Sequence, residues 1–108
     1  MDYTISGKVI KGDAYGRKIG FPTVNLDIGK QELPKAGVYA GFAVLDKKEF
    51  RAGIVVANNK VEAHLIGYEG DAYGKTVTLK LVKFLREYKK FDSEQELIIQ
   101  IIKDLKLC

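Results

Sequence analysis

Short runs of alternating or β-branched residues, separated by turn residues, fill most of this chain. The clearest run, residues 76–81, alternates polar with apolar residues and places Val77, Leu79, Leu81 and then Leu85 on the inward face of a long strand. The pair Asn58–Asn59 is typical of a two-residue hairpin turn, because asparagine tolerates a left-handed backbone. Similar runs predict five further strands, over residues 3–11, 21–28, 37–45, 49–57 and 60–68.

A helix follows the strands. Ser93 and Glu96 form a capping box, and apolar residues then recur at helical spacing at Ile98, Ile101, Ile102 and Leu105. That apolar stripe needs an apolar partner, which the strands can supply. We therefore predict a mainly β fold, a six-stranded antiparallel barrel of Greek-key type with a C-terminal α-helix over its open end or side. With 108 residues and 46% hydrophobic content, we expect a single domain over residues 1–108.

Composition narrows the classes of function. No apolar run approaches the roughly 20 residues that span a bilayer, and the first residues lack the pattern of a signal peptide, so we expect a cytoplasmic protein without a membrane partner. The single cysteine, Cys108, excludes a disulfide framework and a multi-cysteine zinc site. A net charge of +4 is compatible with nucleotide phosphate or nucleic acid. For the basic cluster at residues 80–90 a solvated face is favoured over a nucleic-acid surface, because no aromatic ladder alternates with it.

Residues 16–25 combine two glycines, a proline, two adjacent cations, a threonine and an asparagine. Glycines let backbone N–H groups approach a ligand, cations attract phosphate, and a hydroxyl with an amide oxygen can face a hard metal ion. The stretch is equally compatible with a structural turn before a strand. Neither the P-loop pattern nor the Rossmann glycine pattern occurs in the chain, so a nucleotide would need another kind of loop.

Glu62 is the most notable carboxylate. Alternation places Glu62, His64 and Ile66 on one face of a strand and Val61, Ala63 and Leu65 on the other. If the second set fills the core, Glu62 and His64 face solvent or a cleft. An exposed strand residue is the simpler interpretation of Glu62, and a structural hydrogen bond is favoured over a ligand role for His64.

Taken together, several segments resemble the riboflavin kinase family, the flavokinase module that also forms the C-terminal half of bacterial bifunctional FAD synthetases. The most specific of them is the Gly-Phe-Pro-Thr-x-Asn signature at residues 20–25. The matching segments cover nearly the whole chain in family order, at residues 7–12, 16–25, 33–34, 37–40, 62–65, 71–74, 85–86 and 90–93.

The resemblance implies a riboflavin-kinase-like barrel that phosphorylates the ribityl 5′-hydroxyl of riboflavin with ATP and Mg²⁺, giving FMN and ADP. It implies that Thr23 and Asn25 bind Mg²⁺ and that Glu62 is the catalytic base, on opposite sides of a barrel mouth. The nucleotide-binding residues it implies are Gly12, Tyr15, Gly16, Arg17, Lys18, Gly20, Pro22 and Thr23. The flavin-binding residues are Tyr73, Arg86 and Phe91. The partners are then riboflavin/FMN and ATP/ADP, with no nucleic acid, and we expect a monomer.

The chain departs from the family at one place. Between residues 53–57 and Glu62 the family usually has a longer segment, whereas this chain has only Asn58-Asn59-Lys60-Val61. This shortened connection leaves open a non-catalytic flavin- or nucleotide-binding barrel derived from the kinase. A small basic barrel that binds nucleic acid is a third alternative.

Overall fold

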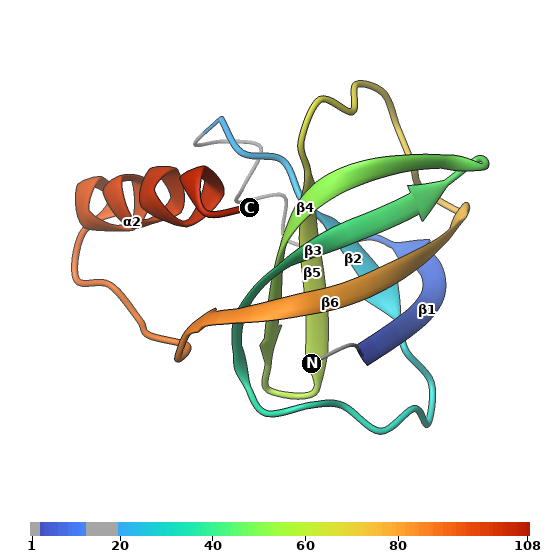
Figure 1. Ribbon diagram of the computed structural model, residues 1–108, viewed down its shortest axis with the longest axis horizontal. Helices are drawn as coiled ribbons and strands as arrows, with labels where there is room; N and C mark the ends of the chain where they lie inside the picture. The colour runs from blue at the N-terminus through green and yellow to red at the C-terminus, as the bar shows by residue number, and fades with distance from the viewer. Residues whose placement is uncertain (1–2, 13–19) are drawn as a thin grey trace.

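Six strands close into an antiparallel barrel with a helix at its side, in a computed structural model that describes residues 3–12 and 20–108 (Figure 1). The predicted mainly β fold is therefore confirmed. The elements are β1 (Tyr3–Ile10), β2 (Val24–Asp27), β3 (Gly37–Leu45), β4 (Lys48–Ala57), β5 (Lys60–Leu65), β6 (Thr76–Arg86) and α2 (Glu94–Lys106).

The strands pair in the order β1-β2-β5-β4-β3-β6, and β6 returns to β1 to close the barrel. Strands β3, β4 and β5 follow one another as hairpins, and β6 then crosses back to lie beside β3. Three consecutive strands with the fourth beside the first define a Greek key. The predicted Greek-key barrel is thus confirmed.

Both tight hairpins have two-residue turns. Asn58 and Asn59 have φ angles of 53° and 58°, and Asp46 and Lys47 have φ angles of 52° and 64°. Two successive residues at positive φ are typical of a type I′ turn, whose twist matches that of the flanking strands. The predicted asparagine turn is confirmed, and β4 begins at Lys48, one residue earlier than predicted.

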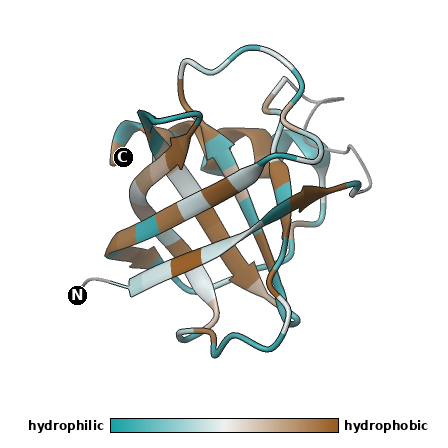
Figure 2. Cartoon of the chain, turned by 90° about the vertical axis from the view of Figure 1, so that its right-hand side faces the viewer, coloured by the Kyte–Doolittle hydropathy of each residue, from teal (hydrophilic) through white to brown (hydrophobic). Residues whose placement is uncertain are grey.

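Core packing follows the alternation of β6 only as far as a bulge. Val77, Leu79 and Leu81 are fully buried, and apolar and polar colours alternate along the strands in Figure 2. The register of β6 against β3 shifts twice beyond Leu81. Because an extra residue reverses which side chains face inward, Phe84 packs against the core and Leu85 does not, contrary to the prediction.

Three predicted strands are shorter in the structure, and β1 ends at Ile10, one residue before the predicted end. The run predicted over residues 21–28 forms strand only at Val24–Asp27, because Pro22 has no N–H for a ladder and Gly20 turns the chain at a φ of 91°. The run predicted over residues 60–68 ends at Leu65, ahead of a turn at Gly67 with a φ of 85°.

Helix α2 extends from the side of the barrel, and its C-terminal end contacts β4 (Figure 1). The Ser93 side chain accepts a hydrogen bond from the backbone N–H of Glu96, which confirms the predicted cap. The predicted apolar stripe is wrong at Ile102, which is 42% exposed. Because successive helix residues are rotated by about 100°, a helix that turns Ile101 and Asp104 toward the cavity beside β4 turns Ile102 outward.

Candidate active site

The pairing of β2 with β5 brings two predicted site residues together. Asn25 lies opposite Glu62, and Val24 lies opposite Ala63. Ala63 is buried in the core, so the next residue pair, Asn25 and Glu62, projects from the outer surface of the barrel wall. Directly opposed side chains have Cβ atoms about 5 Å apart. The predicted alternation of β5 is therefore confirmed.

Thr23 lies just before β2 and contacts the same carboxylate. Its Oγ1 donates a hydrogen bond of 3.1 Å to Oε1 of Glu62. The hydroxyl of Thr23, the amide of Asn25 and the carboxylate of Glu62 thus lie on one patch of the outer barrel wall. The structure thus places the Thr23 hydroxyl in contact with the Glu62 carboxylate, and Asn25 opposite Glu62 on the neighbouring strand.

A cleft of about 610 Å³ lies between this wall and α2. Thr23 and Glu62 line it on the barrel side, and Leu97 and Ile101 of α2 line it on the other. The barrel interior is filled by the core side chains. This cleft lies outside the barrel, between its wall and the helix. The predicted position of the site at a barrel mouth stays a prediction.

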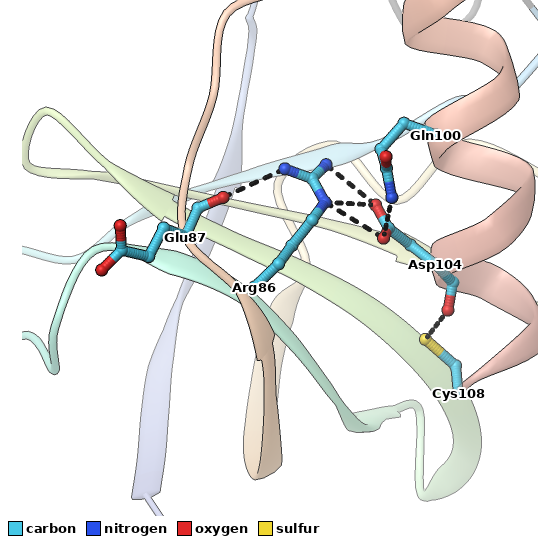
Figure 3. Close-up of polar contacts among 5 residues, drawn as sticks. All are labelled: Arg86, Glu87, Gln100, Asp104 and Cys108. Atoms are coloured by element: carbon cyan, nitrogen blue, oxygen red, sulfur yellow. Dashed lines mark hydrogen bonds and ion pairs between the residues drawn. The ribbon is translucent and has the colours of Figure 1, made fainter.

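Arg86 and Phe91, two of the predicted flavin-binding residues, also line this cleft. Figure 3 shows the Arg86 guanidinium held by the carboxylate of Asp104 from α2, with 2.9 Å between Nη2 and Oδ2 and 3.1 Å between Nε and Oδ1. Arg86 Nη1 also donates to the backbone oxygen of Glu87 at 3.1 Å. The guanidinium carbon lies 5.5 Å from the centroid of the Phe91 ring, within cation–π range.

Asp104 is the partner of Arg86 that the sequence interpretation missed. It is 7% exposed and is the buried charged residue among residues 3–12 and 20–108. Gln100 supports it, donating from Nε2 to Oδ1 at 3.0 Å (Figure 3). A signal was present in the sequence, since Asp104 interrupts the apolar face of α2 between Ile101 and Leu105 and a charge in that place needs a partner.

A second cleft, of about 820 Å³, meets the first at Thr23. It is lined by Gly12, Pro22 and Asn25, and by Tyr73. Tyr73 therefore lies apart from Arg86 and Phe91, with which the resemblance had grouped it. In the second cleft the ammonium of Lys11 lies 5.6 Å from the centroid of the Tyr73 ring.

Of the remaining predicted nucleotide-binding residues, the structure describes only Gly20. Gly20 turns the chain just before Pro22. Tyr15, Gly16, Arg17 and Lys18 lie outside the described residues. The predicted role of residues 12–20 in binding phosphate therefore stays a prediction, and the structure describes only Gly12 and Gly20 of this segment.

The donor set near Thr23 fits a magnesium ion. Magnesium prefers oxygen ligands, keeps several waters and often takes only one or two protein ligands beside substrate phosphates. In the described part of the chain, no group of three or more histidine, cysteine, aspartate or glutamate side chains could hold a metal by itself. Gly12 packs so closely that a Cβ there would lie 2.2 Å from Nδ2 of Asn25. The lack of a side chain at Gly12 thus leaves room for the Asn25 amide.

The fold and the site together define a β-barrel with two clefts that share Thr23 in their linings. A family model described as "Flavokinase: Riboflavin kinase" matches residues 1–108. The chain therefore belongs to the riboflavin kinase family, as the sequence resemblance predicted, and this is a family of kinases. The helices of the described residues include none long and apolar enough to cross a membrane.

Individual proteins of known sequence or structure are similar to this chain. The bifunctional riboflavin kinase/FMN adenylyltransferase of Escherichia coli (strain K12) is 36% identical over 114 residues, covering 94% of this chain and 36% of that protein. A macrolide-efflux protein from Streptococcus pneumoniae has a similar structure, with a TM-score of 0.89, 29% identity and coverage of 96% of this chain and 37% of the other. Riboflavin kinase from Trypanosoma brucei shares the fold, with a TM-score of 0.78, 21% identity and coverage of 98% and 74%. The chain thus spans 36% of the length of its E. coli relative.

Proposed function

We propose that this chain transfers the γ-phosphoryl group of ATP to the ribityl 5′-hydroxyl of riboflavin, giving FMN and ADP, with Mg²⁺ as cofactor. The observation that carries the proposal is the hydrogen bond of 3.1 Å between Thr23 and Glu62, at the point where the two clefts meet. Membership of the riboflavin kinase family supports the choice of substrate. We infer that the first cleft takes the flavin and the second takes the nucleotide.

Each residue then has a distinct task. Thr23 Oγ1 and the Asn25 amide oxygen would hold Mg²⁺, which neutralises charge on the transferred phosphoryl group. The Glu62 carboxylate accepts the proton of the ribityl hydroxyl as that oxygen bonds to phosphorus, and it orients the hydroxyl before the transfer. Phosphoryl transfer depends mainly on positioning and charge stabilisation, so a single carboxylate base is sufficient.

The cleft walls provide the binding surfaces. Phe91, ordered by its contact with Arg86, offers an aromatic face to the flavin ring. Tyr73 and Lys11 lie on the nucleotide side, where the ammonium of Lys11 can attract phosphate. We therefore assign Tyr73 to the nucleotide cleft instead of the flavin cleft. Gly12 and Pro22 lie on the same side, at the two ends of the segment proposed to wrap the phosphates.

We also propose that residues 1–108 act as one monomeric domain in the cytoplasm, where ATP is available. The closed barrel supports the monomer, because each of its six strands has a paired neighbour on both sides, so the described residues leave no open sheet edge for a second copy. Sedimentation velocity tests this, and a dimer at micromolar concentration would contradict it.

Incubation with riboflavin, ATP and Mg²⁺, followed by chromatographic separation of flavins, tests the activity. We expect FMN, and we expect Glu62→Gln to lower kcat by about 10²–10⁴-fold. Glu49→Gln removes an exposed carboxylate from β4 and serves as the matched control, with unchanged activity. Quenching of flavin fluorescence without FMN formation would instead support a non-catalytic binding barrel.

A further inference from the structure

His64 is the single histidine of the chain and lies on the same face of β5 as Glu62. Its Nδ1 lies 2.7 Å from the carbonyl oxygen of Pro22. Its ring meets the ring of Phe21 edge to face, with 6.0 Å between the centroids. Both contacts reach the short segment that leads into Thr23.

We propose that His64 is a positioning residue that holds residues 21–23 against β5 and so directs Thr23 Oγ1 toward Glu62. This inference rests on the proposed function, because it concerns the orientation of a proposed magnesium ligand. A carbonyl oxygen can only accept a hydrogen bond, so Nδ1 of His64 carries the proton and donates it to Pro22. The neutral ring then has its lone pair on Nε2.

The segment needs such support because it precedes the ladder between β2 and β5. That pairing begins at Val24, opposite Ala63. Pro22 has no N–H with which to extend the ladder toward Gly20. Two residues of β5 hold this segment by hydrogen bonds. His64 is bonded to Pro22, and Glu62 is bonded to the next residue, Thr23. A shift of about 1 Å at such a position can cost about a hundredfold in rate.

The tautomer of His64 tests the hydrogen bond directly. In protein without a histidine tag, long-range ¹H–¹⁵N spectra show one imidazole, because the chain has one histidine. At alkaline pH we expect a protonated Nδ1 and an unprotonated Nε2. A neutral ring that carries its proton on Nε2 would overturn the proposal. This measurement needs neither ligand nor turnover.

Two substitutions separate positioning from other roles. The side-chain amide of His64→Asn places an N–H near the position of Nδ1, whereas that of His64→Gln places it near Nε2, and both remove the ring contact with Phe21. Calorimetry of ADP binding with and without Mg²⁺ is the readout. We expect Mg²⁺ to strengthen ADP binding in wild type and His64→Asn, and the strengthening to fall by about tenfold in His64→Gln. Lys60→Gln, an exposed change on β5, should match wild type.

The kinetic expectation is a lower kcat for His64→Gln with little change in the KM for riboflavin, and near-complete rescue in His64→Asn. Equal behaviour of the two variants in calorimetry and kinetics would overturn the positioning role. If wild type forms no FMN, the proposed function fails. The tautomer and the Mg²⁺-dependent ADP binding still decide the inference, so the two failures are distinguishable.

Discussion

Thr23 and Glu62 are 39 residues apart in the chain, yet the threonine hydroxyl donates to the carboxylate. Neither residue is unusual in isolation. A threonine before a strand and a glutamate on the outward face of a strand both have ordinary structural roles. The β2–β5 pairing brings them into contact and places Asn25 opposite Glu62.

At this scale we predict that Thr23→Val abolishes most activity and that Thr23→Ser retains it. Valine keeps the volume of threonine but loses Oγ1, and with it a proposed magnesium ligand and the bond to Glu62. Loss of one such group lowers kcat by about a hundredfold. Initial rates of FMN formation across a Mg²⁺ series provide the measurement, with thermal unfolding as the check on folding. A Thr23→Val variant with wild-type rates would contradict the assignment.

At the scale of elements, α2 is held to the barrel by an ion pair and by close packing. The side chains of Arg86 and Asp104 are 24% and 10% exposed, so their attraction is only partly screened by water. At the end of the chain, the Cys108 thiol donates to the backbone oxygen of Asp104 (Figure 3). A Cβ on Gly53 of β4 would lie 3.2 Å from Cδ2 of Leu105, so glycine lets the helix approach the wall.

We predict that Asp104→Asn loosens α2 and destabilises the protein by about 1–3 kcal/mol, because it leaves the Arg86 guanidinium without its charged partner. Burial, with a smaller contribution from Asp104, raises the pKa of the Cys108 thiol. In wild type the thiol should therefore react slowly with an alkylating reagent. The variant should react faster and unfold at lower temperature.

The matched control for this prediction is Asp46→Asn. It neutralises the ion pair between Asp46 and Lys75, which lies on the surface with side chains 60% and 44% exposed. Exposed ion pairs contribute little to stability, so the Cys108 reaction rate should stay at the wild-type value. Equal reactivity of the Asp104→Asn and wild-type thiols would show that the ion pair does not hold the helix.

At the scale of the whole molecule, closure of the barrel depends on close contact between strands. A Cβ on Gly41 of β3 would lie only 1.9 Å from the backbone oxygen of Lys80 in β6. The same strands carry the two register shifts that let β6 bend along the wall. The three nearest atoms all belong to the backbone of Lys80 and Leu81, so no flexible side chain is there to move aside.

We therefore predict that Gly41→Ala destabilises the barrel by at least about 2 kcal/mol. Gly53→Ala, whose nearest neighbour is the flexible end of Leu105, should cost clearly less. Urea unfolding followed by circular dichroism measures both. A Gly41→Ala variant as stable as the Gly53→Ala variant would contradict the role of this contact in closure.

The sequence by itself determined the local elements, because each depends on neighbours in the chain. Strand β3 over Gly37–Leu45, the Asn58–Asn59 turn, the Ser93 cap and the outward face of Glu62 all follow from turn chemistry, capping and alternation. The catalytic role proposed for Glu62 came from the family resemblance. Alternation alone predicted only that Glu62 is an exposed strand residue.

Only the tertiary structure decided which distant residues meet. The bulge in β6 turns Phe84 inward in place of Leu85, and the orientation of α2 exposes Ile102 and brings Asp104 to Arg86. Strand pairing and helix orientation are settled when the barrel closes and packs, since each depends on contacts between segments far apart in the chain. No local pattern carries that information, which is why the cleft between α2 and the barrel wall emerges only from the folded chain.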